Sequence, residues 1–233
     1  HTAIRRQRQM CIRDRLEEIN WKDNDVDFVL ECTGKFNSKE KLIPHLSNGA
    51  KKVIVSAPCK NADKTIVFGV NEKEIKKEDK IISAASCTTN CLAPVAHVLN
   101  ENFEIEKGFM TTIHSFTTDQ RILDNSHKDI RRARTASQSI VPTSTGASKA
   151  IGEIIPSLIF CSKKDLSVEK INSAFKNFSK KQKIKVLEIT EEKLVSIDFN
   201  HNPASSIVDA SLTNVIGKNM GKISAWYDNE WGF

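Results

Sequence analysis

A cysteine and a histidine have the surroundings that nucleophilic catalysis requires. Cys87 lies in the segment Ser83-Ala-Ala-Ser-Cys-Thr-Thr-Asn-Cys91, where a predicted strand ends and a predicted helix begins. The unpaired N–H groups and the positive dipole end of a helix N-terminus stabilise a thiolate and lower the pKa of a cysteine there. His114 ends the next predicted strand and precedes a polar loop, a common place for a catalytic imidazole. These residues predict a thiolate nucleophile with a neighbouring base.

The ordinary roles of both residue types must be weighed against this hypothesis. A lone cysteine is usually a small buried side chain, and a histidine at a strand end is usually only solvated or hydrogen-bonded. Judged on residue type alone, the ordinary roles are favoured. Four other histidines do not end a strand near such a thiol and are interpreted as structural. These are His45, His97, His127 and His201.

A second group of residues suits an oxyanion such as phosphate. Lys128, Arg131, Arg132 and Arg134 form a basic cluster, and Pro142-Thr-Ser-Thr-Gly146 precedes a predicted helix. Backbone N–H groups at a helix start and guanidinium groups both bind phosphate oxygens. A solvated basic surface beside an ordinary helix cap is the alternative. Two such elements close together in the sequence favour anion binding.

Alternating strands and helices must position these residues. In the first half, a helix ends near Asn48 and Gly49, and the apolar runs between polar loops predict a parallel sheet covered by helices. Its strands are expected at residues 26–30, 53–55, 65–70 and 80–83. In the second half, we expect helices on one face of a mostly antiparallel sheet. The helices are expected over 88–99, kinked by Pro94, and around Val168 to Phe178, and the strands at 108–114, 184–189, 207–210 and 223–226.

Composition narrows the function classes. The 233 residues carry a net charge of +6, but the first fifteen hold five arginines and one aspartate without any apolar periodicity. The rest of the chain has no basic stripe interleaved with aromatic residues, so nucleic acid is not expected as the main partner. No apolar run approaches the roughly 18 residues of a membrane span, and the N-terminus lacks a signal-peptide pattern, so the cytoplasm is the expected compartment.

The cysteines predict free thiols. Six are scattered along a chain long enough to fold without bridges, which favours a reducing compartment over a disulfide framework. Cys87 and Cys91 would share one face of a helix, but no CxxC pair or suitably spaced histidine completes a zinc site. We therefore expect no metal.

Five segments resemble the signature sequences of phosphorylating glyceraldehyde-3-phosphate dehydrogenases, in the order of that family. They are ASCTTNC, HSFTTDQ, HKDIRRAR, PTSTGASKA and WYDNEWG. Together with DFVLECTGKF and VIVSAP, they extend the resemblance from about Trp21 to Phe233. The likeness therefore covers nearly the whole chain except its basic N-terminal segment.

The resemblance implies a mechanism and a set of site residues. Cys87 would attack the aldehyde of a phosphorylated substrate and His114 would take up the proton, while hydride leaves for NAD. Inorganic phosphate would then release an acyl phosphate from the Cys87 thioester. By motif match, the attacking phosphate would be held by Ser86, Thr88, Thr145 and Gly146. The substrate's own phosphate would be held by Thr117, Asp119 and Arg132. NAD would be held by Thr33, Gly34, Phe36, Ser56, Asn229 and Phe233, the last of which, like Phe116, stands where many members have tyrosine.

The resemblance also implies the architecture, which is α/β. Residues 1–15 are an unmatched basic arm, and 16–86 are the remainder of a NAD-binding domain with an incomplete Rossmann-type parallel sheet. Residues 87–233 are a truncated α+β catalytic domain with a mostly antiparallel sheet. The family is usually homotetrameric.

The sequence departs from the family in three places. The Gly-rich turn that holds the pyrophosphate, and the acidic residue for the ribose, have no match, and the chain stops before the family's C-terminal helix, so both ends are expected to be truncated. After Leu158 a segment is missing, including an arginine that serves both phosphate pockets. We expect a strand to be absent from the middle of the catalytic sheet, with its neighbours unpaired. The missing segment belongs to a region used for subunit contacts, which bears on the tetramer.

Three other functions stay open. An erythrose-4-phosphate dehydrogenase would use the same cysteine, histidine and NAD on a longer aldehyde. A chain without cofactor binding could act only as a weak thiol esterase through Cys87 and His114. A chain with these losses could also be an inactive fragment that folds against intact partners.

Overall fold

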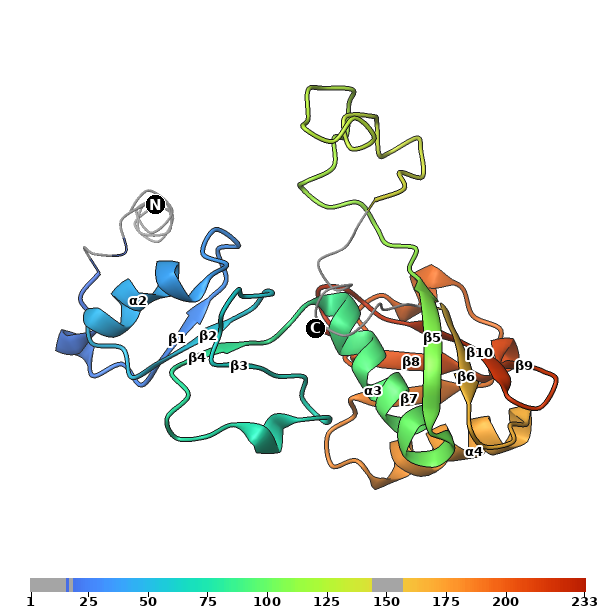
Figure 1. Cartoon of the computed structure of the whole chain (residues 1–233). Coiled ribbons are helices and arrows are strands. Elements are labelled where there is room, and N and C mark those ends of the chain that lie inside the picture. The colour runs from blue at the N-terminus through green and yellow to red at the C-terminus, as the bar shows by residue number, and fades with distance from the viewer. Residues whose placement is uncertain (1–15, 17–18, 144–156) are drawn as a thin grey trace. The chain divides into compact units, whose positions relative to one another are not determined.

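The computed structural model describes residue 16 and residues 19–143 and 157–233. The chain divides after Ser86 into two compact units, the second of which comprises residues 87–233 (Figure 1). None of the helices within the described residues is both long and apolar enough to cross a membrane.

A four-stranded parallel sheet forms the centre of the first unit. Its order is β1-β2-β4-β3, and each adjacent pair runs parallel. The parallel pairing confirms the expected sheet type. Burial alternates along β1, where Val29 is buried and Phe28 and Leu30 are exposed, so one face of that strand is not covered within the described residues. The strands are β1 (Phe28–Glu31), β2 (Lys52–Val55), β3 (Lys64–Thr65) and β4 (Ile81–Ser83).

Helix α2 (Lys39–Ser47) covers this sheet and ends where the sequence predicted. Its Leu42 side chain is fully buried in a core with Val29, Val53 and Ile81. Gly49 then reverses the chain with a φ of +107°, and a Cβ at this position would lie 2.7 Å from the Cβ of Lys22. Only glycine fits there, because the backbone is left-handed and the neighbouring chain is close.

One strand prediction in this unit is too long. A strand over 65–70 was expected, but the ladder stops at Thr65. The chain turns at Val67, whose N–H donates to the Asn71 side chain, and the Val70 N–H donates to the Val67 carbonyl. These local bonds replace ladder pairing. Two short 3₁₀ helices complete the unit, η2 (Lys22–Asn24) and η3 (Glu72–Glu74).

The second unit is built on a six-stranded, mostly antiparallel sheet. Its order is β5-β6-β10-β8-β7, with β9 also paired to β10, and only β7 and β8 run parallel. The strands are β5 (Ile105–Thr111), β6 (Ser157–Ser162), β7 (Leu187–Thr190), β8 (Ser206–Asp209), β9 (Asn214–Ile216) and β10 (Met220–Trp226). The short 3₁₀ helices are η5 (Ser196–Phe199) and η6 (Ala210–Leu212).

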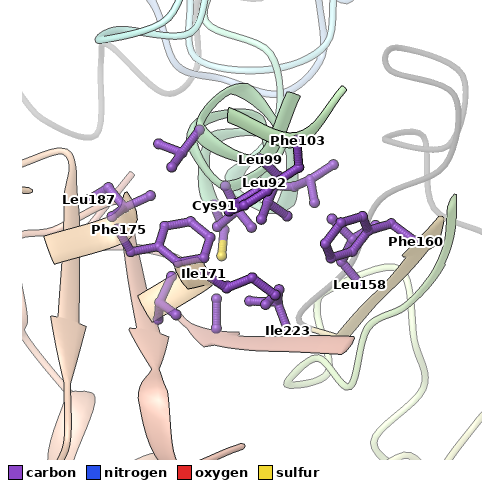
Figure 2. Close-up of a cluster of buried hydrophobic side chains, with 14 of the residues drawn as sticks. Cys91, Leu92, Leu99, Phe103, Leu158, Phe160, Ile171, Phe175, Leu187 and Ile223 are labelled. Carbon is purple, nitrogen blue, oxygen red and sulfur yellow. The ribbon is translucent and has the colours of Figure 1, made fainter. Parts of the chain in front are cut away.

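Two helices cover one face of this sheet, α3 (Cys87–Phe103) and α4 (Val168–Lys181) (Figure 1). Helix α4 begins at Ser167, whose side chain accepts from the Lys170 N–H, and ends at two lysines that complement the helix dipole. Its Ile171 and Phe175 lie one turn apart and are fully buried. Figure 2 shows these side chains meeting Leu99 of α3 and Ile223 of β10 in the main core.

Strand β6 was not predicted, and it changes the interpretation of the internal gap. It pairs antiparallel with β5 on one side and with β10 on the other, so the sheet continues through residues 157–162. The expectation that the neighbours of the missing segment are left unpaired is therefore wrong for the described strands. Burial alternates along β6, because Leu158 and Phe160 face the helices while Ile159 faces away.

This register of β6 predicts a difference between two adjacent residues. Phe160 is 1% exposed and Ile159 is 44% exposed. Phe160→Ala should lower the free energy of unfolding by about 3–5 kcal/mol, because it leaves a cavity in the core. Ile159→Ala, the matched control, should cost about 1 kcal/mol or less, since little buried surface is lost. Urea titration measures both. Equal losses, or a larger loss for Ile159→Ala, would show that β6 does not occupy this register.

Candidate active site

The thiol of Cys87 faces the imidazole of His114. Strand β4 ends at Ser83 and α3 begins at Cys87, so the predicted strand-to-helix position of the cysteine is confirmed. Its Sγ lies 3.4 Å from the His114 Nε2. His114 stands three residues beyond the end of β5 at Thr111, in the loop and not on the strand where the sequence placed it. Both residues are partly buried. This distance allows a proton to pass between sulfur and nitrogen.

The hydrogen bond made by the His114 Nδ1 determines whether its Nε2 donates or accepts. His114 Nδ1 lies 2.6 Å from the carbonyl oxygen of Ser115. A carbonyl only accepts, so Nδ1 carries a hydrogen and donates it. The ring is held with Nε2 directed at the thiol, where it takes up the proton of Cys87.

Electrostatics favour an ion pair between the two groups. Burial alone would raise the pKa of the Cys87 thiol, but the hydrogen bond and the charge of His114, with hydrogen bonds from Thr88, outweigh it and lower that pKa. The pKa of His114 is raised, chiefly by its hydrogen bond to Cys87, against the opposing effect of burial and with support from the Ser115 carbonyl. Opposite shifts of this kind stabilise thiolate and imidazolium together.

Tyr227 is a site residue that the sequence analysis did not identify. Its ring lies edge-on to the His114 imidazole, with centroids 5.8 Å apart, and its hydroxyl is 3.0 Å from the Thr88 Oγ1. Burial is the main cause of its raised pKa, so the hydroxyl stays protonated. Its place in WYDNEWG was the available signal, but that motif pointed first to Asn229.

The other cysteine of α3 has the opposite character. Cys91 is fully buried one turn further along the helix, and its Sγ lies 3.5 Å from the Ser206 Oγ. Burial raises the pKa of its thiol to about 12. Two cysteines four residues apart are therefore a reactive thiol and an inert one.

The predicted phosphate residues Asp119 and Arg132 are brought together in the loop after β5. The Arg132 guanidinium forms an ion pair with Asp119, and its Nε lies 2.6 Å from the Thr143 Oγ1 and 3.6 Å from an Asp129 oxygen. His127, interpreted from sequence as structural, lies 3.4 Å from Asp119. Arg132 is thus held in place by two carboxylates and a hydroxyl.

Asn229 is fixed from two directions. The Ser115 hydroxyl donates to its Oδ1 at 3.5 Å, which links it to the loop that carries His114. The neighbouring Asp228 carboxylate accepts from the backbone N–H groups of His201, Glu230 and Trp231, at 2.8 to 2.9 Å. These bonds lower the pKa of Asp228. The terminal segment is therefore pinned on both sides of Asn229.

The predicted cofactor residues of the first unit follow the carboxyl ends of two neighbouring strands. Thr33 and Gly34 come after β1, and Ser56 comes after β2. Gly34 has a φ of +71° and open space where a Cβ would be. Phe36 packs against the core of this unit. Ligands of parallel sheets bind at this edge, so the arrangement suits a nucleotide.

The other predicted site residues are placed as follows. Ser86 directly precedes α3, the Thr117 N–H donates to the Gln120 side chain at 2.8 Å, and Phe233 is exposed at the chain end. Thr145 and Gly146 lie outside the described residues. The described cysteines are free, and no group of three or more possible metal ligands occurs in the described part of the chain.

Comparison with known proteins identifies a family to which this chain is similar. The family model described as "Glyceraldehyde 3-phosphate dehydrogenase, C-terminal domain" matches residues 86–160 and 157–229. The chain is 46% identical to glyceraldehyde-3-phosphate dehydrogenase 2 of Bacillus subtilis, over 93% of this chain and 70% of the relative. It is 49% identical to glyceraldehyde-3-phosphate dehydrogenase of Zymomonas mobilis, over 89% and 68%. The enzyme of that name from Cereibacter sphaeroides is 47% identical, over 93% and 71%.

These matches also locate an interruption. The two stretches matched by the family model meet at residues 157–160, where β6 begins. The alignment with the Bacillus protein runs over 239 residues although it uses 93% of a 233-residue chain. It therefore includes positions at which this chain has no residue.

The ion pair predicts how the reactivity of Cys87 depends on pH. A lowered pKa means that the thiolate persists to lower pH than in an ordinary cysteine. His114→Gln removes the imidazole base and its positive charge, so the midpoint of iodoacetamide alkylation should move to higher pH and the rate at neutral pH should fall. Cys87→Ser should abolish the fast phase and Cys91→Ser should not. Superimposable profiles for the wild type and His114→Gln would contradict the ion pair.

Proposed function

This chain belongs to the glyceraldehyde-3-phosphate dehydrogenase family, and we propose on that basis that it oxidises and phosphorylates glyceraldehyde 3-phosphate to 1,3-bisphosphoglycerate with NAD. The observation that carries this proposal is the contact of 3.4 Å between the Cys87 Sγ and the His114 Nε2. A thiolate with an adjacent imidazole at a helix start is the group that covalent aldehyde oxidation requires. The reaction belongs to glycolysis and gluconeogenesis.

The residues present fit a nicotinamide nucleotide. Thr33, Gly34 and Ser56 follow the carboxyl ends of adjacent parallel strands, and the open backbone at Gly34 admits a close ligand. With Phe36 they would hold the nucleotide from the first unit, while Asn229 and Phe233 belong to the second. When bound, NAD supplies the hydride acceptor for the oxidation.

The first step is covalent attack on the aldehyde, and residues of this chain supply the reacting groups. The Cys87 thiolate forms a bond to the aldehyde carbon, and the carbonyl oxygen becomes an alkoxide. The protonated His114 Nε2 stabilises that oxygen and donates its proton to it. As the carbon is oxidised, the same nitrogen takes the hydroxyl proton back, and a thioester on Cys87 remains. The Ser115 carbonyl holds the ring orientation throughout.

Phosphate then releases the product. A phosphate oxygen attacks the thioester carbon, the carbon–sulfur bond breaks, and the acyl phosphate leaves while Cys87 returns to the thiolate. We assign the attacking phosphate to the hydroxyls and backbone near Ser86, Thr88, Thr145 and Gly146. The substrate's own phosphate is assigned to Thr117, Asp119 and Arg132. The lowered pKa of Cys87 makes its thiolate a good leaving group.

The same proposal assigns roles to the parts of the chain. Residues 16–86 are the remainder of the NAD-binding domain, and 87–233 are the catalytic domain, which the match at 86–160 and 157–229 supports. The free thiols at the described cysteines support action in the reducing cytoplasm. A homotetramer is the assembly that family membership favours.

One assay tests this function. Purified chain is added to glyceraldehyde 3-phosphate, inorganic phosphate and NAD, and the absorbance of reduced cofactor is followed. We expect turnover in the wild type and a loss of about a thousandfold or more in Cys87→Ser, because that variant has no thiolate to form the thioester. Cys91→Ser serves as the control, since Cys91 is buried away from solvent.

Parallel wells with NADP and with erythrose 4-phosphate identify the preferred cofactor and aldehyde. Absence of turnover in a folded sample whose Cys87 still alkylates rapidly would overturn the proposed dehydrogenase activity. Turnover that persists in Cys87→Ser would overturn the thioester mechanism.

A further inference from the structure

Two titratable side chains are almost completely buried in the first unit. Glu31, the last residue of β1, is 4% exposed, and His45 of α2 is 2% exposed. A buried carboxylate persists only where hydrogen bonds replace its hydration. The proposed mechanism uses neither residue. Their burial and hydrogen bonds therefore indicate a role outside that mechanism.

The Glu31 side chain holds the segment that follows β1. Its Oε1 accepts the backbone N–H of Thr33 at 2.8 Å and also the Thr33 hydroxyl. The Thr33 Oγ1 in turn accepts the N–H of Lys35 at 3.2 Å. One carboxylate oxygen of Glu31 thus fixes the backbone conformation of the turn that contains Gly34.

The backbone of the same residue holds a second segment. The Glu31 carbonyl accepts the Ser56 N–H at 3.0 Å and lies 3.4 Å from the Ser56 Oγ. Glu31 therefore contacts both strand-end segments that the proposed function assigns to the cofactor.

The other carboxylate oxygen is fixed by a chain of hydrogen bonds with a single direction. Glu31 Oε2 lies 3.3 Å from the His45 Nε2, and the Trp21 Nε1 lies 3.1 Å from the His45 Nδ1. An indole N–H can only donate, so the His45 Nδ1 must accept and its Nε2 must carry the hydrogen. The Nε2–H then donates to Glu31. Residue 31 must therefore accept on both oxygens, which a carboxylate does and an amide does not.

We infer that Glu31 is a positioning residue for the cofactor, held by His45 and Trp21, that fixes the Thr33–Gly34 turn and Ser56 in the conformation that binds NAD. This inference rests on the proposed function for the cofactor part of its claim. Its structural part, the control of the turn by the Trp21–His45–Glu31 chain, stands on the hydrogen bonds alone. Residues that orient a binding group through a fixed hydrogen bond change affinity without touching the ligand.

The direction of the hydrogen bonds from Trp21 through His45 to Glu31 defines a set of variants that break or restore them. Glu31→Gln places an NH₂ group against either the His45 Nε2–H or the Thr33 N–H, so two donors face each other in both orientations of the amide. The His45 ring cannot exchange its hydrogen while Trp21 donates to Nδ1. Adding Trp21→Phe removes that donor and lets the Nε2 accept from Gln at position 31. His45→Gln keeps the direction, because an amide oxygen accepts from Trp21 and its NH₂ donates to Glu31, whereas His45→Leu does not.

The experiment combines hydrogen exchange with cofactor binding in the purified full-length chain. Amide exchange at residues 33–35 reports the turn, calorimetric titration reports NAD affinity, and the KM for NAD is compared with kcat. Glu78→Gln, the same change at an exposed carboxylate of this unit, is the control. We expect Glu31→Gln to accelerate exchange and weaken NAD binding about tenfold, with kcat little changed. Trp21→Phe with Glu31→Gln, and His45→Gln alone, should recover most of both losses, unlike His45→Leu.

The outcomes separate the two claims. Unchanged exchange in Glu31→Gln, or a double variant as fast as the single one, would overturn the control of the turn. Faster exchange with unchanged NAD affinity would overturn the positioning role while leaving the proposed function intact. A wild type that protects residues 33–35 but does not bind NAD would overturn the proposed function and, with it, the cofactor part of this inference.

Discussion

The contact between Cys87 and His114 is the interaction on which the rest of the second unit depends. A thiolate needs an exposed path to substrate and also a partner that offsets burial, because burial by itself opposes its charge. Helix α3 meets both needs, since Cys87 stands partly buried at its first position while Leu92, Val95 and Leu99 anchor the same helix in the core. The sheet must then deliver an imidazole to the first turn of α3. The loop after β5 carries His114 to that turn, and the ring of Tyr227, which follows β10, lies edge-on to the imidazole.

Local patterns predicted the elements that carry the thiol. The small residues after β4, the apolar spacing in α3 and α4, and the parallel apolar runs of the first unit each encode their own structure over a few residues. Strand β6 was missed for a physical reason. Ser157 to Ser162 contain only four consecutive apolar residues, and pairing with β5 and β10, remote in sequence, makes them a strand. His114 was placed on a strand because Thr111 to Ile113 have β-forming side chains, yet the ladder ends at Thr111.

The buried histidine shows a second limit of sequence reasoning. His45 has no neighbour in sequence that suggests a special role, and interpreting it as a structural side chain was reasonable. Its partners come from a preceding turn and from the end of β1, so the polar chain through Trp21 and Glu31 exists only after α2 packs on the sheet. Tyr227 is similar, because its two contacts lie on α3 and on the loop after β5. Contacts between elements, and not residue type, give these side chains their function.

The internal interruption affects anion binding more than thiol chemistry. His114 and Thr88, which lower the pKa of Cys87, and Tyr227, which contacts both of them, all lie outside residues 157–162, and β6 continues the sheet. The arginine that serves both phosphate pockets in the family has no match in this chain, so more of the proposed phosphate binding falls to Arg132. Its guanidinium already contacts the carboxylates of Asp119 and Asp129, and a phosphate must compete with both. Because such contacts hold the substrate before and during reaction alike, their loss weakens binding without lowering the reactivity of the thiolate. In the proposed mechanism the Cys87–His114 pair and the phosphate sites are therefore separable, and the first can persist while the second is reduced.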